Sequence, residues 1–305
     1  MDELETPVVL IVFNRPQTTR QVFERISRAR PKTLFLVADG PRPGKPDDAR
    51  RCQEVREIVQ SVSWDCDVHC DFSDVNLGTK MRISSGLDRV FSVVDRAIIL
   101  EDDCVPDQSF FPYCDCLLET FEGDPRVMLI CGTNPAENDV AVPYSYYFSR
   151  YLVCWGWATW ARAWKYYDGE MSLWPLARDQ KLLEGLFENR ESVRYWAKRF
   201  QMTYEGKLNS WGYPWTLSCW LQNGLSIFPS RNLVSNIGFG SQATNTLGRR
   251  NRLANLLVSQ MQFPLIPPPY VQRFMPADSY IERFIFRDRL LAPLKKWMKQ
   301  KLTRS

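Results

Sequence analysis

Three consecutive acids, Glu101, Asp102 and Asp103, directly follow a short apolar run at residues 97–100. The run is short, aliphatic and bounded by polar residues, which indicates a buried strand. Open α/β sheets bind ligands at the carboxyl ends of their strands, and adjacent carboxylates repel one another unless a cation or hydrogen-bond donors compensate. The motif therefore predicts a site for a divalent metal and a nucleotide-sugar. A solvated acidic loop that caps the next helix is the alternative.

Polar residues follow two other predicted strands in the same way. Asn14 and Arg15 come after the apolar residues 8–13, and Asp39 comes after residues 33–38. Residues 76–82 begin a predicted helix, whose backbone N–H groups, with Lys80 and Arg82, could hold a diphosphate. The alternative for this helix is a capped start with exposed cations. Polar and charged residues that could bind a ligand follow several predicted strands, which favours a binding site over a merely capped helix start.

Aromatic residues make up 13% of the chain and cluster in its second half. Trp155 and Trp157 flank a glycine, and Trp211 follows further along. Aromatic faces suit sugar rings, so these three residues are candidates for a wall of the sugar or acceptor site. Core packing is the alternative, and it is the favoured one for Trp160.

The composition excludes several classes of chemistry. His69 is the only histidine, so Ser-His-Asp catalysis, Cys-His catalysis and a His-ligated metal centre would all depend on one residue. The nine cysteines lack a zinc-site spacing, and their odd number indicates a reduced, cytosolic compartment. A net charge of +4 is too small to indicate a nucleic-acid partner. Any general base must therefore be a carboxylate.

The elements that position these residues alternate along the first half of the chain. We expect strands at residues 8–13, 33–38, 67–72, 97–100 and 127–131, and helices at 17–29, 47–62, 79–91 and 109–121. The strands recur about every 30 residues, which is the length of a βαβ unit. This rhythm predicts an α/β fold with a mostly parallel sheet and helices on both faces.

The second half lacks that rhythm. We expect residues 1–135 to form a nucleotide-sugar-binding half and residues 136–262 to form the acceptor-side half of the same domain, with a helix at 190–205.

Residues 263–305 form a Pro-rich connector and a basic tail. Apolar residues recur at helical spacing among the basic ones in 284–305, which indicates either an amphipathic helix on an anionic membrane or a surface helix packed on the body. No apolar stretch reaches the length of a membrane span, and the acidic N-terminus predicts no signal peptide.

Several of these segments, taken together, resemble one family. Residues 9–16, 38–42, 76–78 and 98–103, and later 154–157 and 232–240, are similar to a bacterial group of sugar-nucleotide glycosyltransferases with the Rossmann-like GT-A fold. That group is distantly similar to N-acetylglucosaminyltransferase I. The resemblance extends over residues 7–246, and its segments are specific only as a set.

The resemblance implies roles for individual residues. Asp39 would contact the base or ribose of the nucleotide, and Glu101 and Asp102 would bind the donor ribose and sugar. Asp103 would ligate Mn²⁺ or Mg²⁺, which agrees with the preference of hard cations for carboxylate and phosphate oxygens. The cation would neutralise charge on the departing diphosphate.

Two positions depart from the family pattern. Gly212 stands where the inverting relatives have an Asp that resembles their general base, and Asn245 stands in a segment where the family tends to have His. Inverting transfer needs a group that accepts the proton of the acceptor hydroxyl. Glu205 is nearby in the sequence and could substitute, although a glutamate on a helix surface is the simpler interpretation.

These features predict a metal-dependent, inverting glycosyltransferase that uses a nucleoside diphosphate-sugar and a glycan or lipid-linked acceptor, in surface polysaccharide synthesis. Its expected location is the cytoplasm, on the inner face of the membrane. A catalytically degenerate sugar-nucleotide-binding partner is the first alternative, because of Gly212 and Asn245. A nucleotidyltransferase ranks third, because the sequence has no convincing Gly-rich nucleotide loop.

Overall fold

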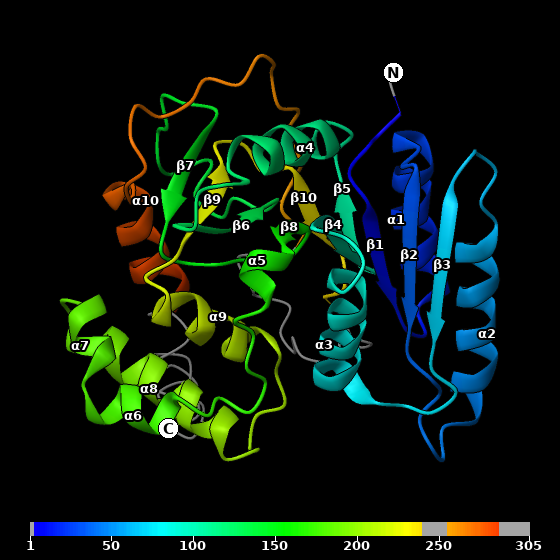
Figure 1. The fold of residues 1–305 in the computed structure, drawn as a ribbon, viewed down its shortest axis with the longest axis horizontal. Coiled ribbons are helices and arrows are strands. Elements are labelled where there is room, and N and C mark those ends of the chain that lie inside the picture. The colour runs from blue at the N-terminus through cyan, green and yellow to red at the C-terminus, as the bar shows by residue number, and fades with distance from the viewer. Residues whose placement is uncertain (1–2, 240–254, 287–305) are drawn as a thin grey trace, which may run out of the picture.

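A computed structural model describes residues 3–239 and 255–286 of the chain. An eight-stranded sheet runs through the molecule in the order β3-β2-β1-β4-β8-β6-β9-β7 (Figure 1). The four strands at one side, β3, β2, β1 and β4, are mutually parallel. Beyond them the sheet is mixed, because β8 is antiparallel to both β4 and β6. The expected α/β class and mostly parallel sheet are confirmed.

The alternating elements of the first half are also confirmed. Each predicted strand and helix is present within a few residues of its expected bounds, because continuous apolar runs mark most of the strands and apolar stripes mark the helices. The elements are β1 (Val8–Val12), α1 (Pro16–Ala29), β2 (Thr33–Ala38), α2 (Pro46–Gln60), β3 (Asp67–Phe72), α3 (Gly78–Phe91), β4 (Arg96–Glu101), α4 (Phe110–Thr120) and β6 (Val127–Cys131).

The second half contributes further strands to the same sheet. The predicted helix at 190–205 is α8, and residues 225–233, whose sequence is typical of a strand followed by a turn, contain β9. The sequence did not reveal the other elements. The remaining elements as far as residue 239, α8 and β9 included, are β5 (Cys104–Pro106), β7 (Tyr146–Ser149), β8 (Trp157–Trp160), α5 (Ala161–Trp164), α6 (Trp174–Asp179), α7 (Leu182–Leu186), α8 (Arg190–Tyr204), α9 (Gly212–Leu221), β9 (Leu225–Pro229) and β10 (Val234–Asn236).

Both faces of the sheet are covered by helices, which gives two hydrophobic cores. Helices α1, α2 and α4 pack on one face, and α3 with α5 to α9 pack on the other. Successive residues of β1 alternate between the two cores, since side chains along a strand point to opposite faces. Every residue of β1 is therefore buried. A rigid central sheet results, and its strand ends can hold loops in fixed positions.

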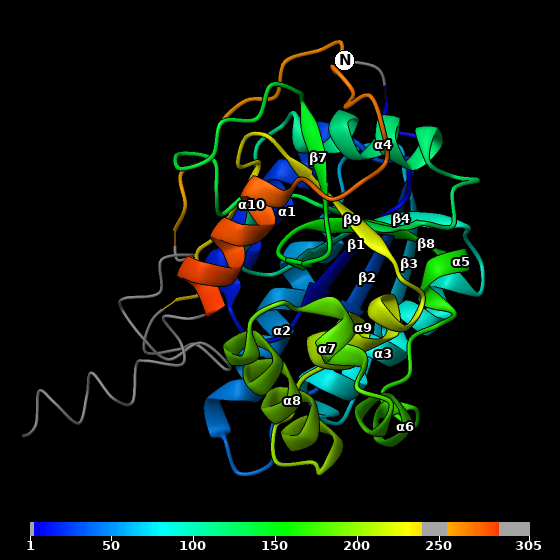
Figure 2. The same ribbon diagram turned by 90° about the vertical axis from the view of Figure 1, so that its left-hand side faces the viewer.

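The segment after residue 255 crosses the outer side of the second half and ends in α10 (Met275–Tyr280) and the π-helical turn Ile281–Phe286 (Figure 2). Asp278 anchors it, because its carboxylate accepts a hydrogen bond of 2.6 Å from Ser149 Oγ and lies 3.6 Å from Arg150 Nε. Within residues 3–239 and 255–286, no helix is long and apolar enough to cross a membrane. The rest of the predicted tail, 287–305, lies outside the described residues.

Candidate functional site

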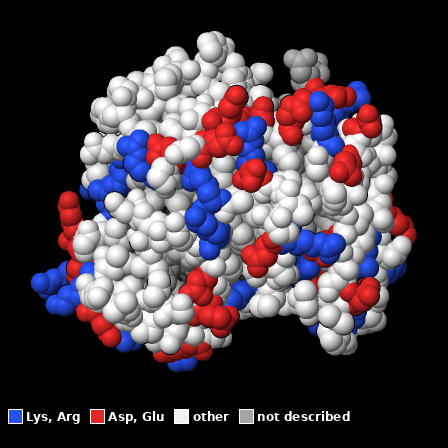
Figure 3. Space-filling view, in the orientation of Figure 1, with Lys and Arg blue, Asp and Glu red and all other residues white. Residues whose placement is uncertain are grey.

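The parallel strands bring three polar loops to one edge of the sheet. Strand β1 pairs with β2 on one side and with β4 on the other, all in the same direction. The loops that follow them carry Arg15, Asp39 and Asp103, so these predicted site residues share the carboxyl edge of the sheet. The surface is notched here, between helices α6 to α8 and the loop into α2, and acidic and basic side chains are mixed around the notch (Figure 3).

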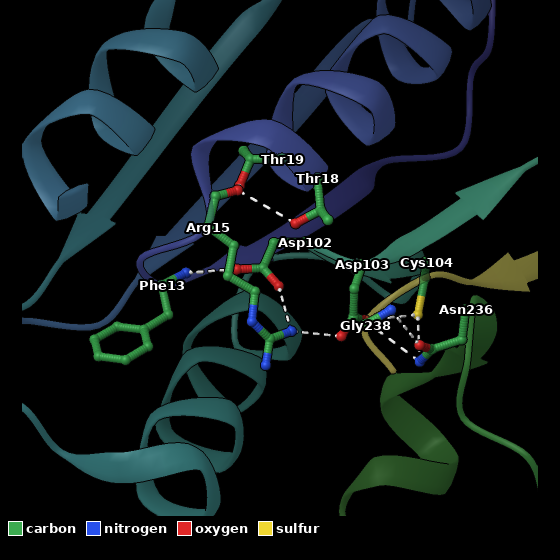
Figure 4. Close-up of polar contacts among 9 residues, drawn as sticks. All are labelled: Phe13, Arg15, Thr18, Thr19, Asp102, Asp103, Cys104, Asn236 and Gly238. Carbon is green, nitrogen blue, oxygen red and sulfur yellow. Dashed lines mark hydrogen bonds and ion pairs between the residues drawn. The ribbon is translucent and has the colours of Figure 1, made fainter. Parts of the chain in front are cut away.

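Arg15 joins the loop after β1 to the acids after β4 (Figure 4). Its Nη1 lies 2.5 Å from Asp103 Oδ2 and 3.4 Å from Asp102 Oδ1. Asp102 is also fixed by the backbone, because the N–H of Phe13 donates to its Oδ2 at 3.1 Å. The two carboxylates are therefore held by one guanidinium and one backbone donor, all from the loop that begins α1.

A second segment closes on Asp103 from the other side. Strand β10 pairs antiparallel with β5, which places Asn236 opposite Cys104. The Nδ2 of Asn236 lies 3.4 Å from Asp103 Oδ1, and a Cβ added at Gly238 would lie only 2.0 Å from Asp103 Oδ2. Only glycine permits this approach of the backbone to the carboxylate. The sequence interpretation did not single out Asn236 or Gly238 as site residues; their only signal was their position in the 232–240 segment.

The acidic cluster carries more negative charge than its neighbourhood neutralises. Burial, followed by repulsion from Asp103, raises the pKa of both Glu101 and Asp102 well above the usual range of carboxylates, and Arg15 opposes the shift only in part. Three adjacent carboxylates facing one guanidinium leave an excess of negative charge when all are ionised. Protonation of Glu101 and Asp102 or a cation bound nearby would relieve this excess.

The residues fit a divalent cation that takes only one or two ligands from the protein. In the described part of the chain, no group of three or more His, Cys, Asp or Glu side chains could hold a metal ion by itself. Mg²⁺ and ions like it are commonly bound by one or two carboxylates, with substrate phosphates and water completing the shell. Asp103 suits that arrangement by its hard oxygens and by the local excess of negative charge.

Asp39 holds the start of α3. Its two carboxylate oxygens accept hydrogen bonds from the backbone N–H groups of Leu77 and Gly78 at 2.8 and 2.9 Å, and from Asn76 Nδ2 at 3.0 Å. The side chain is buried. These bonds tie the end of β2 to the helix that the sequence predicted as a diphosphate site. The contact of Asp39 with a nucleotide stays a prediction.

Asn14 has a similar positioning role. Its Nδ2 donates to Asp48 Oδ1 at 2.8 Å, and Arg42 Nε donates to Asp48 Oδ2 at 2.6 Å. The guanidinium of Arg42 also lies over the ring of Phe13, 5.3 Å from its centroid. Asp48 therefore links the end of β1 to the first turn of α2, and neither Asp48 nor Arg42 was predicted as part of the site.

The two cations predicted at α3 have different surroundings. Arg82 is buried and ion-paired with Asp71 at the end of β3, so it does not present its guanidinium to a diphosphate, and that expectation is corrected. Lys80 remains partly exposed and lies 3.1 Å from Glu170 Oε1. A carboxylate at an exposed position can give way to a phosphate, so Lys80 stays a candidate.

The aromatic wall also needs correction. Trp157 is fully buried in β8 and stacks on Trp211, with ring centroids 5.6 Å apart. Trp211 is itself buried. Both belong to the core on the α3 side of the sheet, because β8 runs between β4 and β6, an arrangement that the sequence did not indicate. Trp155 is half-buried and meets Phe239 edge to face, so it is the one member of the trio still suited to a wall.

The region of the expected base lies close to this edge. A Cβ at Gly78 would lie 3.9 Å from Asn209 Nδ2, which brings the segment before Gly212 to the start of α3. Glu205 ends α8 on the surface, and its ion pair with Lys207 lowers its pKa, which makes it a weaker base. Asn245 lies outside the described residues.

Comparisons with known proteins find only distant similarity. No protein-family model matches the sequence, and no curated protein does. Similar solved structures include a mannosyltransferase from Pyrobaculum calidifontis in complex with GDP-Man and Mn²⁺, with 14% identity, a TM-score of 0.34, and coverage of 52% of this chain and 45% of that one. UDP-glucose pyrophosphorylase complexed with UDP-glucose has 10% identity, a TM-score of 0.27 and coverage of 48% and 62%. The 4-diphosphocytidyl-2C-methyl-D-erythritol synthase of Anaerococcus prevotii has 8% identity, a TM-score of 0.36 and coverage of 91% and 96%.

The chain spans less than half of that mannosyltransferase and less than two thirds of the pyrophosphorylase. These similarities are too distant to carry any statement about activity, which depends on the site itself.

Proposed function

We propose that this chain is a glycosyltransferase of GT-A-like fold that moves a sugar from a nucleoside diphosphate-sugar to a glycan or lipid-linked acceptor. The observation that carries the proposal is the position of Glu101, Asp102 and Asp103 at the carboxyl end of β4. There Asp102 and Asp103 pair with Arg15, and all three acids adjoin the loops that follow β1 and β2. Ligands of open α/β sheets bind at this edge. The resemblance of the same segments to sugar-nucleotide glycosyltransferases supports the assignment.

The donor's phosphates would bind at the start of α3. Asp39 already accepts from the N–H groups of Leu77 and Gly78 there, so the phosphates would depend on Lys80, in the first turn, once it leaves Glu170. Asp103 would hold Mn²⁺ or Mg²⁺, which would offset the charge that develops on the departing diphosphate. Asp102, whose Oδ2 is held by the backbone N–H of Phe13, would orient the donor sugar or ribose.

The group that accepts the acceptor's proton is unassigned. Gly212 carries no proton acceptor, and Glu205 is paired with Lys207. These two observations favour the alternative proposal, a partner protein that binds a sugar-nucleotide without transferring it. A nucleotidyltransferase remains the third proposal, and it predicts pyrophosphate release from a nucleoside triphosphate and a sugar phosphate.

Donor turnover is the first test. The protein is incubated with a panel of nucleoside diphosphate-sugars and with glycan and lipid-linked acceptors, with and without Mn²⁺, and released nucleoside diphosphate is measured. Acceptor-dependent release supports the transferase. Donor binding in calorimetry without release for any acceptor supports the binding partner instead.

A gain-of-function variant sharpens this test. Gly212 is the first residue of α9, its added Cβ would have no neighbour nearer than Ser210 Oγ at 3.9 Å, and a carboxylate is favourable at a helix N-terminus. Gly212→Asp is therefore expected to fold and to raise acceptor-dependent turnover. Gly123→Asp, where an added Cβ meets nothing within 4 Å, is the matched control and should change nothing. Equal turnover in Gly212→Asp and the parent would count against position 212 as the place of the base.

A further inference from the structure

The carboxylate assigned to the metal is already paired with a cation of the protein. Arg15 Nη1 lies 2.5 Å from Asp103 Oδ2, and both side chains are largely buried, with 18% and 14% of their surfaces exposed. A charge-assisted bond of this length is strong, and the partial burial protects it from screening by salt. Arg15 therefore occupies the position that a divalent ion would need.

Asp103 has little room for both partners. The backbone at Gly238 approaches Oδ2 so closely that an added Cβ would lie 2.0 Å away, and Asn236 Nδ2 lies 3.4 Å from Oδ1. A guanidinium and a divalent cation also repel each other. Asp103 can thus bind Arg15 or a metal ion at Oδ2, but not both.

The backbone of Arg15 is held by contacts that do not involve its side chain. Its carbonyl accepts hydrogen bonds from Thr19 N at 3.0 Å and from Thr19 Oγ1 at 2.8 Å, and the next residue, Pro16, begins α1. The release proposed below therefore asks for a change of side-chain rotamer, away from Asp102 and Asp103, and not for a movement of the backbone. A diphosphate is a natural partner for the released guanidinium, because Arg binds phosphate oxygens in a bidentate manner.

We propose that Arg15 is a resident counter-ion that keeps divalent metal off Asp103 until a nucleoside diphosphate draws the guanidinium away. Metal and donor then bind with positive coupling, and the free protein does not hold a metal tightly. This inference rests on the proposed function for its donor, but its central claim concerns the metal alone. Arg15 is in this sense a positioning residue that acts through Asp103.

The test measures Mn²⁺ binding directly, through the electron paramagnetic resonance signal of free Mn²⁺. The full chain is titrated as wild type, Arg15→Gln, Arg15→Lys and Arg20→Gln, which is a matched control on the exposed side of α1. We expect Arg15→Gln to bind Mn²⁺ alone about tenfold more tightly than wild type, because the competing cation is gone. Arg15→Lys should lie between them and Arg20→Gln should match wild type.

The same titrations are repeated with UDP, GDP, CDP and ADP. A nucleotide that binds should tighten Mn²⁺ binding about tenfold in wild type and much less in Arg15→Gln. Asp103→Asn added to Arg15→Gln should remove the gained affinity, and thermal unfolding establishes that each variant is folded.

The outcomes separate this inference from the proposed function. Unchanged or weaker Mn²⁺ binding by both folded Arg15 variants would overturn the inference, even if the wild type transfers sugar. Tighter Mn²⁺ binding in Arg15→Gln without binding of any nucleotide supports the competition at Asp103 and contradicts the proposed donor.

Discussion

The role expected of Asp103 depends strongly on the groups that surround it in the folded protein. The sequence presented it as one of three neighbouring acids, whereas the structure gives it a guanidinium, an amide and a close backbone within reach. Arg15 and Asp103 were both predicted as site residues, but from separate strand ends. Their direct pairing could not be predicted, since it depends on the side-by-side arrangement of β1 and β4.

Substitution of Asp103 is the sharpest prediction at this scale. Asp103→Asn keeps the shape of the side chain and removes the charge that a divalent ion requires. We expect metal-dependent donor binding to fall at least tenfold, measured by calorimetry in Mn²⁺ and again in chelator. Glu170→Gln, which alters an exposed partner of Lys80, should leave the metal dependence intact. Metal-dependent affinity that survives in Asp103→Asn would contradict the assignment of Asp103.

At the scale of a single element, one buried carboxylate, Asp39, holds the start of α3. Asp39 accepts bonds from the backbone of Leu77 and Gly78 and from Asn76, and it is buried. An amide at position 39 has only one acceptor oxygen and would leave buried donors unpaired. Asp39→Asn should therefore lower the free energy of unfolding by about 2 kcal/mol.

Urea denaturation followed by circular dichroism measures this effect. Asp74→Asn, at an exposed position in the same loop, serves as the control and should leave the midpoint unchanged. A similar loss in both variants would mean that the loop is sensitive to charge in general, and that Asp39 has no special role.

The first turn of α2 gives a prediction about pH. Hydrogen bonds from Arg42, followed by one from Asn14, lower the pKa of Asp48 to about 2. A carboxylate whose pKa is lower in the folded protein stabilises it above the pKa of the unfolded chain, and that contribution is lost as the pH falls toward 2. Arg42 is half exposed, so screening by solvent limits the contribution to about 1 kcal/mol.

Chemical denaturation at pH 7 and at pH 3 tests this. Asp48→Asn should cost about 1 kcal/mol at pH 7 and less at pH 3, because at pH 3 the unfolded chain of the parent binds a proton at Asp48 whereas the folded protein mostly does not. Asp47→Asn, the preceding residue on an exposed part of the same turn, is the control. An equal cost of Asp48→Asn at the two pH values would show that its bonds do not depend on its charge.

At the scale of the whole molecule, the C-terminal segment is the part whose role is still a prediction. Its described portion is anchored to β7 through Asp278 and Ser149, and the basic stretch predicted to contact a membrane extends beyond it. Deletion of residues 287–305 should weaken binding to anionic vesicles, since it removes clustered Lys and Arg, and should spare donor binding. Co-sedimentation with vesicles of anionic and of neutral lipid measures it. Equal binding of the full and shortened chains to anionic vesicles would refute the membrane contact.

The sequence by itself determined the alternating half of the fold and the polar strand ends. Apolar periodicity and spacing are local properties, and they fixed β1 to β4, β6 and α1 to α4 within a few residues. Only the tertiary structure decided that β8 runs antiparallel between β4 and β6, which buries Trp157 and removes it from a sugar wall. It also decided that Arg15 pairs with Asp103 and that Arg82 turns inward to Asp71. Strand order and ion pairing join residues far apart in the chain, so no local pattern encodes them.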